Sequence, residues 1–114
     1  MLKVKKTLLV NSGSSANLLA ISCLTSHKIN ESKRIKIQDE VITVAAGFPT
    51  TVAPILQVGA IPVFLDANPL TGNIESKDLE KYYVEGKTKA VFIAHALGNP
   101  FNLYEILAFS KKSD

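Results

Sequence analysis

The sequence predicts an α/β protein in which a parallel sheet is covered by helices on both faces. Four short apolar runs alternate along the chain with stretches of helical period. The run at residues 40–44 is rich in β-branched residues and lacks strict apolar-polar alternation, which is typical of a strand buried on both faces. Alternating strands and helices predict parallel strands joined by right-handed crossovers, so the strand-to-helix turns gather at one edge of the sheet.

The first strand is expected at residues 6–11, where an apolar run ends at a Ser-Gly-Ser-Ser turn. A helix is expected to follow, because the next apolar residues have helical spacing. Cys23 belongs to that apolar stripe, and we therefore expect it in the core. The stripe comprises Ala16, Leu19, Ala20, Cys23 and Leu24.

The second strand is expected at residues 40–44 and is followed by a helix at about 50–58. Pro54 lacks the N–H that a helix interior requires, so this helix is expected to begin late or to bend. Gly59 directly follows the helical pattern and suits a C-terminal cap.

The third and fourth strands are expected at residues 61–66 and 89–94. Between them a helix is expected at about 76–84. After the fourth strand, Asn102 and Glu105 have the spacing of an N-cap residue and the third residue of a helix, which predicts a last helix there.

Composition excludes several classes of protein. The chain has 114 residues, enough for one domain, and 46% hydrophobic residues, enough for a packed core. Its 13 basic and 10 acidic residues give a net charge of +3, too small to predict nucleic-acid binding. A single cysteine excludes an internal disulfide and indicates a reducing compartment. No apolar run approaches the roughly 20 residues of a membrane span, so a cytoplasmic protein without membrane partners is expected.

The segment at residues 11–17 is the strongest candidate for ligand binding. Gly13, Ser14 and Ser15 would open a helix, where free N–H groups, hydroxyls and the positive helix end together favour an anion such as a phosphate. The alternative is that Ser12 is an ordinary N-cap and the glycine merely eases the turn. The spacing matches neither a P-loop nor a dinucleotide fingerprint.

Three further residues are placed at the same edge of the predicted sheet. Phe48 could lie against a flat ligand, or it could pack in the core. Asp66 and His95 each end a strand, where ligands bind in such sheets, but a turn-forming and a hydrogen-bonding structural role are equally open. No metal site and no Ser-His-Asp arrangement can be assigned from spacing. The residues alone therefore predict a phosphate-anchored ligand on an α/β sheet.

Three segments, residues 11–17, 39–55 and 94–101, together resemble the pyridoxal-phosphate-fold sugar enzymes of the DegT/StrS aminotransferase family. They occur in the family's order over nearly the whole chain. The resemblance implies that residues 1–114 form the N-terminal part of the large cofactor domain of a type I aminotransferase fold, ending before a fifth strand. It departs from the family at Gln38, where glycine commonly precedes Asp-Glu.

The resemblance also implies roles for individual residues. Ser14 and Ser15 would bind the phosphate of pyridoxal or pyridoxamine phosphate, with Gly13 shaping the turn, and Phe48 would stack on the pyridine ring. His95 and Asn99 would support the cofactor site, whereas Asp66 would be structural. No catalytic residue and no metal ligand is assigned to this chain.

Within the family, the similarity is greatest to nucleotide-sugar 3-dehydrases, which remove the C3 hydroxyl of a 4-keto-6-deoxyhexose in the dideoxysugar pathways of lipopolysaccharide O-antigen. This implies a nucleotide-sugar substrate, a homodimer and, in the full-length enzyme only, a [2Fe-2S] cluster served by a separate reductase. Two alternatives stay open: a nucleotide-sugar aminotransferase, and a phosphate-binding fragment without catalytic activity.

Overall fold

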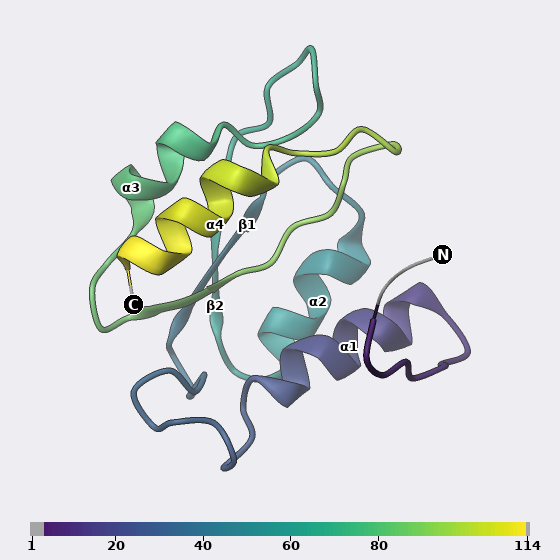
Figure 1. Cartoon of the computed structure of the whole chain (residues 1–114), viewed down its shortest axis with the longest axis vertical. Helices are drawn as coiled ribbons and strands as arrows, with labels where there is room; N and C mark the ends of the chain where they lie inside the picture. Colours follow the sequence, from purple (N-terminus) through teal and green to yellow (C-terminus); the bar gives the residue numbers. More distant parts are fainter. Residues whose placement is uncertain (1–3, 114) are drawn as a thin grey trace.

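The computed structural model describes residues 4–113 and contains a three-stranded parallel sheet with the strand order β2-β1-β3. Helices cover both faces of this sheet (Figure 1), so the predicted fold class is confirmed. In chain order the elements are α1 (Gly13–Cys23), β1 (Glu40–Val44), α2 (Pro49–Gln57), β2 (Ile61–Leu65), the 3-10 helix η1 (Ser76–Asp78), α3 (Leu79–Tyr82), β3 (Thr88–Val91) and α4 (Leu103–Lys112).

The central strand β1 divides the core into two apolar clusters. Val41 is fully buried against side chains of α1 and α2, whereas its neighbour Ile42 is fully buried in the cluster under α3 and α4. Successive side chains of a strand point to opposite faces, so β1 supplies both clusters in turn. Figure 1 shows α1 and α2 together on one side of the strands and α3 and α4 together on the other.

The strand expected at residues 6–11 is absent, and this prediction is wrong. These residues form no strand, and Leu8 and Leu9 are 78% and 93% exposed. Figure 1 shows the segment, in purple, beside α1 and away from the strands. A run of high β propensity becomes a strand only when a neighbour completes its hydrogen-bond ladder, and none of the described strands pairs with it.

Of the predicted apolar stripe, only Leu24 packs against the core cluster, and α1 otherwise faces the core with residues outside that stripe. Asn17, Ile21 and Leu24 point towards α2 and β1, and Ile21 is fully buried. Cys23 is exposed, so its expected core position is wrong. Apolar residues occur on several faces of this helix, and the spacing alone therefore does not identify the face that packs.

The other helices differ from expectation at their ends. Helix α2 begins at Pro49 and continues through Pro54, so the expected late start is wrong. The helix expected at 76–84 is divided into η1 and the short α3. Tyr83 leaves the helix with an extended backbone, and its ring meets the edge of Phe109 at 5.6 Å between centroids. This aromatic contact replaces the last helical turn.

The turn residues agree with the sequence. Ser12 Oγ accepts a hydrogen bond from the Ser15 N–H at 3.1 Å, and Asn102 Oδ1 accepts one from the Glu105 N–H at 3.3 Å. The cap at Asn102 is the expected one, and the cap at Ser12 is the alternative that the sequence left open. Gly59 follows α2 with a φ of 76°, the left-handed conformation of a C-terminal cap.

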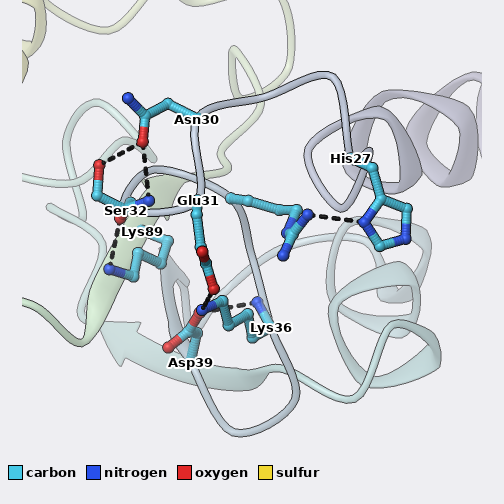
Figure 2. A network of polar contacts seen from close by, with 8 residues as sticks. His27, Asn30, Glu31, Ser32, Lys36, Asp39 and Lys89 are labelled. Carbon is cyan, nitrogen blue, oxygen red and sulfur yellow. Dashed lines mark hydrogen bonds and ion pairs between the residues drawn. The ribbon is translucent and has the colours of Figure 1, made fainter.

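Polar contacts organise the long connection before β1, at the edge of the sheet where the strands begin (Figure 2). Lys36 Nζ lies 2.9 Å from Glu31 Oε1, and this hydrogen bond and the charge of Lys36 lower the pKa of Glu31. The Lys36 N–H donates to Asp39 Oδ2 at 2.7 Å, and Lys89 Nζ donates to the Ser32 carbonyl at 2.8 Å. The connection is thereby fixed against β3.

Gln38 has a φ of 69°, which costs a side chain with a Cβ roughly 1–2 kcal/mol. We expect Gln38→Gly to stabilise the protein by about 1 kcal/mol, because glycine adopts this conformation without strain. Thermal or denaturant unfolding measures the change. The control is Gln57→Gly in α2, where glycine should destabilise by up to about 1 kcal/mol; equal signs for the two variants would contradict the explanation.

Within residues 4–113, no helix combines the length and the apolar character that crossing a membrane requires.

Candidate functional site

A cavity of about 590 Å³ lies at the carboxyl ends of the strands. Turns after β1, β2 and β3 form its wall, as expected for the ligand edge of a parallel sheet. The lining residues are mostly apolar or small: Val44, Ala46, Gly47, Phe48, Thr51, Ala67, Asn68, Pro69, Gly72, Asn73, Ile74, Ile93, Ala94, His95, Ala96 and Leu97. An apolar cavity with a few polar groups at its border is typical of a small-molecule site.

Two of the candidate residues line this cavity. Phe48 is the residue that directly precedes α2, and it is 74% exposed. Its ring is therefore outside the core and available to a ligand. His95 stacks on Phe101 at 4.2 Å between ring centroids. Its Nδ1 faces the Phe101 N–H at 3.3 Å and accepts from it, which fixes the ring in the tautomer protonated at Nε2. His95 therefore has a structural bond as well as a place in the wall.

The segment Gly13–Ser15 lies at the N-terminal end of α1 and is not part of the cavity wall. Ser12 caps the Ser15 N–H, and Ser15 Oγ donates to Asn11 Oδ1 at 2.6 Å. The first N–H groups of a helix have no partner within it, which leaves those of Gly13 and Ser14 at the helix end. Together with the helix dipole they can hold an anion.

Gly13 does not shape this turn, and that expectation is corrected by the structure. It is the first residue of α1 and does not adopt a positive φ. A Cβ built at Gly13 meets no atom within 4 Å. The backbone therefore does not require glycine here, and what the missing side chain provides is open space beside the helix end.

Asn99 and Asp66 both lie outside the cavity wall. Asn99 belongs to a neighbouring hollow that shares Ala96 and Leu97 with the cavity, and its Nδ2 donates to the Thr71 carbonyl at 2.9 Å. Asp66 is exposed directly after β2 and does not line the cavity. Of the three strand-end candidates, the structure thus brings Phe48 and His95 to one cavity.

The sequence analysis missed Asn73, which joins the two loops that form one side of the cavity. Only 6% of Asn73 is exposed. Its Oδ1 accepts from the Ala96 N–H at 3.2 Å, and its Nδ2 donates to the Asn99 carbonyl at 3.0 Å. No local pattern identifies such a residue, because its partners lie more than twenty residues further along the chain.

These groups can bind a ligand. Across residues 4–113, no group of three His, Cys, Asp or Glu side chains could hold a metal ion. His95 is the imidazole in the cavity wall, and its Nδ1 is engaged. The arrangement therefore suits a ligand that combines an anionic group with a flat ring.

A family model described as the DegT/DnrJ/EryC1/StrS aminotransferase family matches residues 1–114. The chain is 53% identical over 109 residues to the lipopolysaccharide biosynthesis protein RfbH of Salmonella typhimurium, covering 96% of this chain and 24% of that protein. It is 50% identical over 111 residues to a dTDP-4-dehydro-2,6-dideoxy-D-glucose 3-dehydratase of Saccharopolyspora spinosa, covering 97% and 24%. The chain thus spans about a quarter of the length of these relatives.

Solved structures show the same architecture. A GDP-4-keto-6-deoxy-D-mannose-3-dehydratase of Escherichia coli with bound hydrated PLP matches with a TM-score of 0.77 and 36% identity, over 90% of this chain and 25% of that one. A sugar aminotransferase of Streptococcus pneumoniae in its PLP form matches with a TM-score of 0.74 and 26% identity, over 90% and 24%. The chain belongs to the DegT/DnrJ/EryC1/StrS aminotransferase family.

Proposed function

We propose that this chain is the N-terminal part of the cofactor domain of a nucleotide-sugar 3-dehydratase that uses pyridoxamine or pyridoxal phosphate. The reaction removes the C3 hydroxyl of a 4-keto-6-deoxyhexose. The observation that carries the proposal is the similarity along nearly the whole chain to a 3-dehydratase and to RfbH, at 50% and 53% identity. A homodimer, and in the complete enzyme a [2Fe-2S] cluster with a separate reductase, belong to the same proposal.

The described residues fit the cofactor. The N–H groups of Gly13 and Ser14 and the Ser15 hydroxyl would hold the phosphate, which is an anion of the kind that helix N-termini bind. Phe48, exposed at the cavity wall, would cover the pyridine ring. His95 would keep the opposite loop in place through its contacts with Phe101.

Bound pyridoxamine phosphate supplies an amino group for the 4-keto carbon and a conjugated ring that accepts electrons as the C3 hydroxyl leaves. The chain's own contribution is to bind and orient. The apolar lining would shield the bound ring from water, and charge-assisted hydrogen bonds at the phosphate would contribute roughly 1.5–3 kcal/mol each. The proton-abstracting group is proposed to come from another part of the enzyme.

The second candidate for the function is a nucleotide-sugar aminotransferase. A solved sugar aminotransferase of Streptococcus pneumoniae matches with 26% identity and a TM-score of 0.74. Because the matches to RfbH and to the 3-dehydratase are longer and more identical, dehydration is the better supported reaction.

The test supplies the protein at its full encoded length with pyridoxamine phosphate, a nucleotide-linked 4-keto-6-deoxyhexose, glutamate and a reductant. Mass spectrometry of the sugar then identifies the reaction. A product lacking the C3 oxygen supports the proposal. A product that gains an amino group supports the aminotransferase instead, and failure to bind the cofactor contradicts both.

We expect Gly13→Val to weaken pyridoxamine phosphate binding by about tenfold, the cost of roughly one charge-assisted hydrogen bond. The free energy of unfolding should stay within about 0.5 kcal/mol, because a Cβ at this position meets no protein atom within 4 Å. Absorbance titration and thermal unfolding measure the two effects. Loss of folding would restore the turn-shaping role, and unchanged affinity would remove Gly13 from the phosphate site.

A further inference from the structure

Helix α2 has a gap in its backbone hydrogen bonding that its own sequence creates. Pro54 lies in the interior of α2 and has no N–H. In a regular helix that N–H would donate to the carbonyl four residues earlier, which belongs to Thr50. The Thr50 carbonyl therefore lacks its helical partner, and leaving such an acceptor unpaired in a partly buried place costs stability.

Helix α1 supplies the missing donor. Asn17 Nδ2 donates to the Thr50 carbonyl at 3.0 Å, across 33 positions of the sequence. Asn17 lies one turn before Ile21, whose side chain is fully buried between α1, α2 and β1. The amide is thus on the face of α1 that packs, and the bond joins the two helices near their beginnings. Figure 1 shows α1 and α2 side by side, both starting at the same end.

The two ends joined by this bond carry different parts of the proposed cofactor site. Ser14 is three residues before Asn17, in the first turn of α1. Phe48 is two residues before Thr50, at the start of α2. A cofactor held at its phosphate by α1 and at its ring by Phe48 requires a fixed separation between these ends, because misplacement of about 1 Å weakens such a site markedly.

We propose that Asn17 is a positioning residue, which uses the carbonyl freed by Pro54 to fix the phosphate-binding end of α1 relative to Phe48. The identity of the ligand in this inference rests on the proposed function. The hydrogen bond between Asn17 and the Thr50 carbonyl is observed independently of that function. Asn17 and Pro54 act together: Pro54 leaves the Thr50 carbonyl without its helical donor, and the Asn17 side chain donates to that carbonyl instead.

The first experiment tests this pair of residues through stability. In the protein at its full encoded length, the unfolding equilibrium is compared for the parent, Asn17→Leu, Pro54→Ala and the double variant. Asn17→Leu should increase the unfolding constant about tenfold, as expected for an acceptor left unpaired. In the Pro54→Ala background the loss should be smaller, because the backbone N–H that this substitution restores would donate to the Thr50 carbonyl. Effects of proline on the unfolded chain cancel in this cycle. Additive effects would overturn the inference.

The second experiment separates positioning from simple packing by using two ligands. Inorganic phosphate needs only the end of α1, whereas pyridoxamine phosphate needs both that end and Phe48. Asn17→Leu should weaken the binding of pyridoxamine phosphate about tenfold and leave the binding of inorganic phosphate unchanged. The control is Ile35→Val, which removes a methyl group from the same core cluster and should leave both affinities unchanged.

The outcomes distinguish the two proposals. Equal weakening of both ligands by Asn17→Leu, or no weakening of pyridoxamine phosphate, would overturn the positioning role. A parent protein that binds no pyridoxamine phosphate would contradict the proposed function, and in that case the stability cycle alone decides whether Asn17 and Pro54 are coupled.

Discussion

Asn73→Leu is expected to destabilise the protein by about 2 kcal/mol and to separate the two loops beside the cavity. The substitution keeps the volume of the side chain but removes an acceptor and a donor at a position only 6% exposed. The Ala96 N–H and the Asn99 carbonyl both lose their partner. A buried polar group without a hydrogen bond costs about 1–3 kcal/mol. Ala96 is half-buried and Asn99 is exposed, so water can replace part of what is lost, and we expect about 2 kcal/mol.

Hydrogen exchange at the Ala96 amide gives the local readout, and denaturant unfolding gives the global one. The matched control is Asn102→Ala, which removes the cap of α4 at a cost of about 1 kcal/mol and should leave Ala96 exchange unchanged. Persistent protection of the Ala96 amide in Asn73→Leu would show that other contacts hold the loops together.

The sequence was sufficient to predict those elements that depend on local chemistry. The strand at Glu40–Val44, the caps at Ser12 and Asn102, and the left-handed Gly59 follow from residue type and spacing, and all are present. Gln38 was recognised as unusual through the resemblance, and its positive φ gives the physical reason.

What could not be predicted depends on partners distant in the sequence. Residues 6–11 have the composition of a strand, but a strand needs a neighbour that composition does not specify. Cys23 and Ile21 both fit an apolar helix face, and only the position of α2 decides that Ile21 is buried. The same holds for the site: Phe48 and His95 were placed at the correct edge by topology, whereas Asn17 and Asn73 act through bonds that no local pattern reveals.

The contact between the two loops beside the cavity also depends on Gly72, which has no side chain. Gly72→Val is expected to lower the free energy of unfolding by about 3 kcal/mol. Gly72 has a φ of 71°, which a β-branched residue adopts only with strain, and a Cβ there would lie 3.1 Å from the Ala96 Cβ. Two penalties therefore add, one from the backbone and one from the clash. Since Gly72 and Ala96 both line the cavity, the clash also widens the space between its loops.

Gly86→Val serves to separate the cost of backbone strain from the cost of the steric clash. Gly86 has a φ of 76°, close to that of Gly72, but a Cβ at Gly86 meets no atom within 4 Å. Its replacement should therefore cost only the backbone strain, about 1–2 kcal/mol, and leave exchange at the Ala96 amide unaltered. The excess cost of Gly72→Val in denaturant unfolding then measures how closely the two loops must approach. If the two variants lose equal stability, the contact between Gly72 and Ala96 is not a constraint, and the hydrogen bonds of Asn73 and Asn99 set the position of the loop.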